Sequence, residues 1–347
     1  MASAGQRRKS GIALFICTGM LMLQSACESV LFIELEESEK LIVVNGAISS
    51  DSLISVQVSR TRHVLDNAPL VPLENAGVRL YHGGTLVERL TYAGNAVYRS
   101  GGFKPSAGEE YVIEVENPGY PSVTARSMIP EPVIIAALDT FTSIVDLSTP
   151  YYSHTIKTLQ IDLTIEDPPG VENYYMVDAE GDLSRTEWYD TTIIYVDSLY
   201  HNGEWHYYVS DSTYQLSKIV RYTDRIPLAS TDLIVEALAS EGILFSDQLI
   251  DGKKYSMRLK TMTGNLGSAD SARVSFRLHS ISESYYRYLK SRQKHYESRD
   301  DYLAVPVIVY SNIESGTGFF GGFSSDVTTI TTFIPEFEGE YWYYETY

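Results

Sequence analysis

The sequence is short of cysteine, with only Cys17 and Cys27 in 347 residues. Cys17 lies within an apolar N-terminal stretch that is typical of an export signal, so a mature chain would keep a single thiol. One thiol cannot form an internal disulfide, and the folded body must therefore be stabilised by apolar packing. A hydrophobic content of 44% is enough for a large core, and the length suggests two domains.

Positive charge is also scarce. The chain has 27 lysines and arginines against 45 aspartates and glutamates, which gives a formal net charge of -18. Loss of residues 1–26 would remove three of the cations and none of the acids, leaving 24 basic residues. Proteins bind nucleic acids by neutralising phosphates with basic side chains, so we predict no nucleic-acid partner.

Long apolar runs are missing apart from one of about thirteen residues, 11–23. This run is shorter than the roughly 20 residues that span a bilayer, and three cations precede it, as in an export signal. Small residues at 25 and 26 then lead to Cys27. We predict that residues 1–26 are a lipoprotein signal peptide and that lipid on Cys27, palmitate included, anchors the chain in a membrane. Gln24 stands where such signals usually have leucine, which leaves open a secretory signal cut near Ala26 without lipidation.

Motifs of known catalytic and metal sites are absent from the sequence. It contains no G-x-S-x-G and no H-E-x-x-H, and its seven histidines show no ligand spacing. The acidic turn at 247–252 lacks the D-x-D-x-D-G order of a calcium-binding loop. His201 and His206 could approach each other across a hairpin, although a solvent-facing hairpin explains them without a metal. We predict no catalytic, cofactor-binding or metal-binding residues, and no enzyme activity.

One glycine pattern resembles a nucleotide-binding motif. Gly316, Gly318 and Gly321 form a G-x-G-x-x-G, which cradles a pyrophosphate when it opens a helix. Here the β-prone residues 327–334 follow. We therefore predict a glycine turn or bulge that lets nearby phenylalanines fold onto a sheet.

Residues 27–40 are acidic and predict a solvated tether between the anchor and the folded body. Residues 41–130 contain short β-branched segments separated by turn residues, which is the pattern of an immunoglobulin-like β-sandwich. The expected strands are 41–48, 53–60, 78–81, 85–90, 96–99 and 111–116. Pro130 and Pro132 then mark a boundary between two domains.

Residues 131–347 predict a larger, tyrosine-rich antiparallel β domain, so the expected fold class is mostly β. Its expected strands are 158–166, 173–178, 188–196, 206–210, 214–221, 254–262 and 272–280. Asp-Pro-Pro-Gly separates the first two and predicts a hairpin. One main α-helix is expected over 281–299, because Ser280 and Glu283 form a capping box. Basic residues on its other faces are expected to pair with acidic neighbours.

Tyrosine is in excess, with 27 residues and several doublets. In a strand, one ring of a doublet faces the core and its neighbour faces solvent, where it offers a partner a large, rigid surface. Simple β propensity explains the same excess, and the sequence leaves both explanations open. The residues that we expect to contact a partner or ligand are Tyr207, Tyr208, Phe319, Phe320, Trp342 and Tyr343.

Several segments resemble a known family. They are 41–47, 76–81 (AGVRLY), 166–175 (EDPPGVENYY), 246–259 (SDQLIDGKKYSMRL), 280–291 (SISESYYRYLKS) and 305–325 (VPVIVYSNIESGTGFFGGFSS). Together they are similar to the Bacteroidota cell-envelope lipoproteins catalogued as domain of unknown function 4249. The resemblance implies a lipoprotein without an assigned reaction, often encoded beside a TonB-dependent outer-membrane transporter.

Two functions of different classes follow from these observations. The first is a non-enzymatic accessory or ligand-capture subunit, lipid-anchored at the outer membrane and attached to a TonB-dependent transporter. The second is a surface or periplasmic enzyme that acts on a glycan or peptide polymer. The face of the outer membrane stays open, because only Glu28 directly follows Cys27 where surface lipoproteins of that phylum commonly carry several acids.

Overall fold

The computed structural model describes residues 39–63, 66, 69–146, 155–238, 241–262, 269–299 and 305–333. By its internal contacts the chain divides into one unit over Met1–Glu39 and a second over Lys40–Tyr347. The predicted signal peptide, Cys27, Trp342 and Tyr343 lie outside the described residues. The described elements all belong to the second unit, and none of its described helices is long and apolar enough to cross a membrane.

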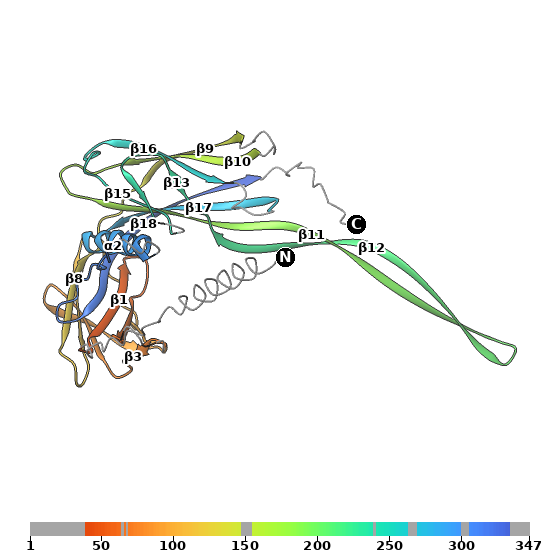
Figure 1. Cartoon of the computed structure of the whole chain (residues 1–347), viewed down its shortest axis with the longest axis horizontal. Coiled ribbons are helices and arrows are strands. Elements are labelled where there is room, and N and C mark those ends of the chain that lie inside the picture. The colour runs from red at the N-terminus through yellow and green to blue at the C-terminus, as the bar shows by residue number, and fades with distance from the viewer. Residues whose placement is uncertain are drawn as a thin grey trace, which may run out of the picture. The chain divides into compact units, whose positions relative to one another are not determined.

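The described part of the chain consists mainly of strands with a single helix, which confirms the mostly β class (Figure 1). The first strands are β1 (Ile42–Ser49), β2 (Ser55–Arg60), β3 (Val71–Pro72), β4 (Gly77–His82), β5 (Thr85–Tyr92), β6 (Val97–Arg99), β7 (Glu110–Glu116) and β8 (Val123–Met128). The elements that follow are β9 (Ile135–Asp146), β10 (Thr155–Glu166), β11 (Tyr174–His201), β12 (Glu204–Arg225), β13 (Ala229–Ser230), β14 (Val235–Ala237), β15 (Ile243–Ser246), β16 (Lys254–Met262), β17 (Ser271–Ile281), α2 (Glu283–Arg299) and β18 (Thr317–Phe333).

The described strands form two sheets. The larger has the order β14-β15-β11-β17-β18-β1-β2-β6-β5-β4-β7-β8, with β12 joined to β11 and β3 joined to β2. The smaller has the order β13-β16-β10-β9. An immunoglobulin-like topology for residues 41–130, and a domain boundary at residue 130, stay predictions.

The smaller sheet packs against the β15-β11-β17-β18 part of the larger one. Alternate residues of β10, including Ile161 and Leu163, are buried in one cluster with Val274, Phe276 and Leu278 of β17. Because side chains alternate between the faces of a strand, this pattern means that one face of each sheet meets the other. The result is a two-layer sandwich with an apolar core.

The last described strand completes a second core that lies in the N-terminal part of the chain. β18 runs parallel to β1, from Val43 opposite Thr317 to Ser49 opposite Phe323. Phe320 is fully buried in the cluster formed by strands β1 to β8. The close approach of β18 requires glycine: a Cβ on Gly318, whose φ is +112°, would lie 2.2 Å from the Val44 carbonyl oxygen. The predicted positive-φ glycine is therefore confirmed, and a strand rather than a helix follows it.

The predicted hairpin between 158–166 and 173–178 is wrong. β10 pairs with β9 and β16, whereas β11 pairs with β12, β15 and β17. The Asp-Pro-Pro-Gly segment therefore carries the chain from one sheet to the other, with Gly170 in a left-handed conformation (φ +79°). The strands expected at 188–196, 206–210 and 214–221 are likewise parts of the two long strands β11 and β12.

The predicted helix is present as α2, but its capping residue is Ser282 and not Ser280. The Ser282 hydroxyl accepts a hydrogen bond from the Tyr285 amide at 3.3 Å, while Ser280 belongs to β17 and its hydroxyl accepts from the Val133 amide at 3.2 Å. The expected pairing of basic residues is also found. Lys290 lies 2.5 Å from Glu236, and Arg292 pairs with Glu241.

Candidate functional site

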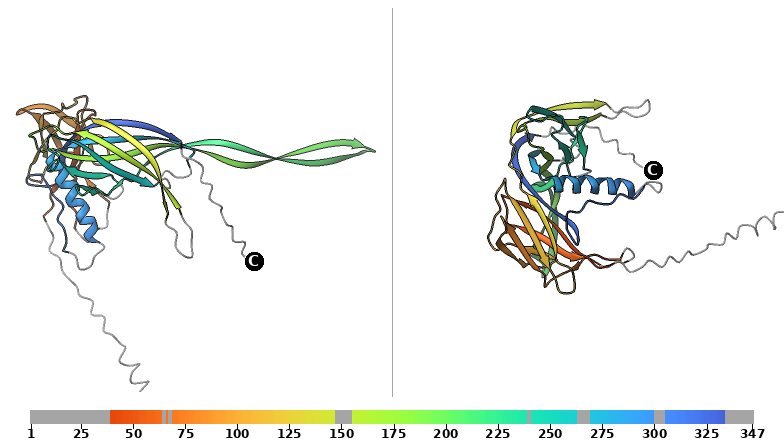
Figure 2. Two further views of the ribbon diagram at one scale, coloured as in Figure 1. Left: turned by 90° about the horizontal axis from the view of Figure 1, so that it is seen from above. Right: turned by 90° about the vertical axis from the view of Figure 1, so that its left-hand side faces the viewer.

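The most exposed feature of the second unit is a long two-stranded ribbon (Figures 1 and 2). β11 pairs with β17 only from Tyr174 to Ser184, whereas it pairs with β12 as far as His201. Residues 185–221 therefore continue beyond the sheet, and we call this segment the arm. Its tip is Asn202-Gly203, with φ of 52° and 88°, the left-handed pair that a type I′ hairpin turn requires.

The arm presents large apolar side chains on both of its faces. Cross-strand register puts Tyr189, Ile193, Tyr195, Leu199, Tyr208, Tyr214 and Leu216 on one face. It puts Trp188, Ile194, Val196, Tyr200, Trp205, Tyr207, Val209 and Ile219 on the other. Each of these fifteen side chains is 43–68% exposed. A soluble protein rarely exposes contiguous apolar area of this extent unless it binds a partner there.

Charge on the distal part of the arm, residues 188–217, is of one sign. Between Trp188 and Ser217 the sequence has four acids and no lysine or arginine. Basic residues lie only at the base, where Lys218 pairs with Glu187 at 3.0 Å. There the Asp270 carboxylate also accepts hydrogen bonds from the amide and hydroxyl of Thr186, at 2.7 and 2.8 Å. The base is thus tied to the rest of the unit, and the distal part is aromatic and acidic.

The structure separates the residues that the sequence suggested as contacts. Tyr207 and Tyr208 lie on opposite faces of the arm and are 68% and 58% exposed. Phe319 and Phe320 are instead buried, at 7% and 0% exposure, and Phe319 stacks on Tyr288 of α2 with ring centroids 4.2 Å apart. These two phenylalanines have no free surface for a partner, because β18 places them between the N-terminal core and the helix.

The two histidines near the arm tip are not directly opposed. His201 lies opposite Glu204, and His206 lies opposite Leu199. The imidazoles are therefore diagonal neighbours on one face, and diagonal positions are about 7–8 Å apart. This spacing does not by itself form a metal site.

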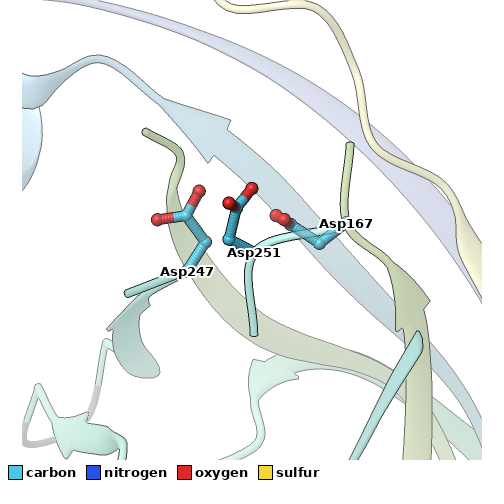
Figure 3. Close-up of side chains that lie close together, drawn as sticks. All are labelled: Asp167, Asp247 and Asp251. Atoms are coloured by element: carbon cyan, nitrogen blue, oxygen red, sulfur yellow. The ribbon is translucent and has the colours of Figure 1, made fainter. Parts of the chain in front are cut away.

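Three aspartates from two loops lie close together beside the start of β11, at the end of that strand away from the arm (Figure 3). Asp167 follows β10, Asp247 follows β15, and Asp251 lies in the turn before β16. One carboxylate oxygen of each lies within 4.8 Å of the other two, and this is the only such group of potential metal ligands within the described ranges. Sequence reasoning noted the turn at 247–252 but missed Asp167, because the crossing between the sheets that brings it there leaves no local signal.

Each carboxylate of this cluster already accepts hydrogen bonds. The Tyr175 hydroxyl and the Gly252 amide donate to Asp167 at 2.5 and 2.9 Å. The Asn173 amide donates to Asp247 at 2.7 Å. The Gly170 amide donates to Asp251 at 2.8 Å. Oxygens of this kind suit a hard cation such as Ca²⁺, and the bonds present hold the two loops together.

Burial changes the acid–base properties of this cluster. It raises the pKa of Asp247, and the neighbouring charges of Asp167 and Asp251 act in the same direction. Burial also raises the pKa of the Tyr175 phenol, which donates to Asp167. The fully ionised form of the cluster is therefore electrostatically unfavourable, and a bound proton or cation would stabilise it.

A polar series crosses three strands of the large sheet. The His279 ring on β17 is 2.7 Å from the Ser325 hydroxyl through Nδ1 and 3.0 Å from the Asp178 carboxylate through Nε2. Arg277 donates to Asp178 at 2.7 Å. Burial opposes ionisation of Asp178, but the bonds to His279 and Arg277 outweigh it and lower its pKa. A hydroxyl, an imidazole and a carboxylate in series can act as a nucleophilic relay.

Comparison with known proteins places the chain in a family. A search of curated proteins finds no match to it. The family profile described as "Domain of unknown function (DUF4249)" matches residues 28–329, which is most of the chain. The match spans the arm, the aspartate cluster and both cores. The chain therefore belongs to the DUF4249 family.

Proposed function

We propose that this protein is a non-enzymatic accessory or ligand-capture subunit at the outer membrane. In this proposal lipid on Cys27 holds it at the membrane, and the arm docks on a membrane-embedded partner, a TonB-dependent transporter. The lipid anchor and the transporter rest on the sequence and on the family resemblance. The docking role of the arm rests on its exposed apolar surface, which is the observation that carries the proposal.

The exposed area of the arm is large enough for a stable complex. An aromatic side chain has about 150–250 Å² of surface, so the eight on the arm, four on each face, present about 800 Å² at roughly half exposure to a partner that covers both faces. A standard protein–protein interface buries about 800 Å² on each partner. Tyrosine and tryptophan are also the residues that most often dominate binding energy at such interfaces.

The backbone of the arm offers a second mode of attachment. Among the described strands, β11 beyond Ser184 pairs only with β12, and β12 pairs only with β11. The outer edges of both strands therefore keep backbone donors and acceptors that an added strand can pair with. A partner that supplies a strand would gain main-chain hydrogen bonds together with aromatic contacts on both faces.

The charge of the arm favours a protein partner over a lipid surface. Peripheral membrane segments usually carry lysine or arginine, each worth about 1 kcal/mol near an anionic leaflet. The distal arm has none between Trp188 and Ser217, and its four acids would be repelled.

A shortened arm tests this proposal without disturbing the sheet. Glu187 lies directly opposite Lys218, just as His201 lies opposite Glu204 next to the turn. The two pairs are fourteen residues apart along β11, an even number, so they occupy equivalent positions in the hydrogen-bonding pattern of the hairpin. Deleting 188–201 and 204–217 therefore leaves Asn202-Gly203 to close the hairpin between Glu187 and Lys218. We expect the affinity-tagged parent to co-purify with a TonB-dependent transporter in stoichiometric amounts and the shortened variant to lose it.

Matched substitutions separate the two faces. Tyr195→Ser with Tyr208→Ser alters one face, and Tyr200→Ser with Trp205→Ser alters the other. Tyr296→Ser, at an aromatic ring of α2 that is 51% exposed, is the control and should leave co-purification unchanged. Full retention of the transporter by the shortened variant would exclude docking through the arm.

The series Ser325, His279 and Asp178 favours the enzyme alternative as a second candidate. The cavity beside it, lined by Asp178, His279, Tyr285 and Phe323 among others, has a volume of about 200 Å³. Ligand sites are commonly about 300–1,000 Å³, so a polymer substrate fits poorly. Labelling of the parent by a fluorophosphonate, lost in Ser325→Ala, together with polymer turnover by the purified protein, would support the enzyme over the docking subunit.

A further inference from the structure

A pocket separate from the arm lies where distant parts of the chain meet. It has a volume of about 680 Å³, within the range of about 300–1,000 Å³ that is typical of ligand sites. One side is formed by β8 and the segment that follows it, the other by the loop between β10 and β11, and residues 281–283 add the start of α2. Its apolar lining includes Pro130, Val133, Ile134, Pro168, Val171 and Ile281.

Hydrogen bonds fix both walls in place. The loop wall is held by the aspartate cluster, since the amides of Gly170 and Asn173 donate to Asp251 and Asp247 at 2.8 and 2.7 Å. The opposite wall is held where the Val133 amide donates to the Ser280 hydroxyl at 3.2 Å. A pocket whose walls are held before a ligand arrives loses less free energy to ordering when it binds.

The charged residues that line this pocket are all acidic. Its lining contains Glu131, Glu166, Glu172 and Glu283 and no lysine, arginine or histidine. Two of these acids pair with exposed basic residues that lie outside the lining: Glu166 lies 3.5 Å from Lys254, and Glu283 lies 3.5 Å from Arg287. Across the described ranges, Glu131 and Glu172 have no basic partner.

An aromatic ring belongs to the same lining. Tyr174 contributes to the pocket and packs on Tyr286, with ring centroids 4.6 Å apart. The face of a tyrosine ring attracts cations, by about 0.5–1 kcal/mol when exposed and more when desolvated. Carboxylates beside an aromatic ring and an apolar floor form the usual environment in which proteins bind organic ammonium groups.

We propose that this pocket binds an organic cation, an ammonium group carried on an apolar body. The apolar body lies against Val133, Ile134 and Val171, and the ammonium group lies toward Glu131, Glu172 and the Tyr174 ring. This site goes beyond the proposed docking function, because none of its residues belongs to the arm.

Three probes with one chain length separate charge from apolar burial. Octylammonium, octanol and octanoate are titrated by calorimetry into the chain carrying Cys27→Ser, which keeps lipid out of the measurement. We expect octylammonium to bind with one site per chain and at least tenfold more tightly than octanol, and octanoate to bind most weakly. Loss of the arm should leave all three affinities unchanged, so failure here and failure of the docking proposal are distinguishable.

Substitutions at exposed positions assign the site. The double variant Glu131→Gln with Glu172→Gln should weaken octylammonium at least fivefold and leave octanol unchanged. Val171→Ser, at a side chain that is 57% exposed, should weaken both probes. Glu204→Gln at the arm tip is the control and should change neither. Equal affinities for octylammonium and octanol, an unchanged double variant, or the lack of saturable binding would each overturn the proposal.

Discussion

The side chain of Asn312, which lies outside the sheets, is expected to stabilise β18. Its Nδ2 donates to the Phe320 carbonyl at 2.7 Å and to the Arg126 carbonyl at 3.2 Å. Its Oδ1 accepts from the Phe320 amide at 2.9 Å. Asn312 therefore pairs with Phe320 as a neighbouring strand would, and it connects β18 to β8.

The expected cost of removing this side chain follows from those three bonds. A protein hydrogen bond contributes about 0.5–1.5 kcal/mol net, and a buried group left without a partner costs about 1–3 kcal/mol. Phe320 is fully buried, so its amide cannot replace the lost bond with a hydrogen bond to water. We expect Asn312→Ala to lower the free energy of unfolding by about 2–4 kcal/mol.

Urea unfolding followed by far-ultraviolet circular dichroism, which reports the strands themselves, measures this loss. Asn117→Ala is the control, because the Asn117 side chain makes only a local, exposed bond of 3.3 Å to the carbonyl of Pro118. It should change stability by less than about 0.5 kcal/mol, as surface substitutions usually do. If Asn312→Ala also stays within that margin, the side chain does not act as a strand substitute and the reasoning fails.

Three further predictions concern the same fold. Gly322→Ala should lower the melting temperature, because its Cβ would lie 2.2 Å from the Met128 carbonyl oxygen, whereas Gly102→Ala, with nothing within 4 Å, should not. Asp247→Asn should become more stable relative to the parent as pH rises above 3.8. Burial raises the pKa of Asp247 in the folded state, so the parent loses stability as this carboxyl gives up its proton, whereas the variant has no proton to lose. Measuring the free energy of unfolding of both proteins at several pH values tests this. Deleting 188–201 and 204–217 should leave the unfolding free energy nearly unchanged in urea titration, because the deleted side chains are exposed and lie outside both cores; a loss above about 2 kcal/mol would contradict this.

Local sequence patterns predicted the strands in which buried and exposed residues alternate. The strand at 158–166 is part of β10 because Leu159, Ile161 and Leu163 face one core, and β-branched alternation is a direct consequence of a half-buried sheet. The C-terminal end of α2 at Arg299 also agrees with the predicted helix. Its cap was misplaced by two residues because the pairing of β17 with β18 continues through Ile281, so Ser280 is still part of the strand and the helix begins only at Glu283.

The arm was recognised only in fragments. Both faces of its strands are exposed, so apolar and polar residues do not alternate along them as they do in a half-buried strand. The polar residues within each strand were therefore interpreted as turns, which divided the two long strands into shorter ones. The aspartate cluster and the parallel pairing of β1 with β18 were also beyond local reasoning. Both depend on residues far apart in sequence, and a periodic pattern identifies a strand without identifying its neighbour.

The pairing of β1 with β18 also affects how the protein reaches its folded state. The N-terminal core lacks a buried wall until residues near Phe320 arrive, and almost the whole chain separates that residue from Ile42. Contacts between such distant segments form slowly, because the long intervening chain must lose conformational entropy before the two segments meet. A chain made from its N-terminus would thus leave this core incomplete until residues 317–323 had been synthesised.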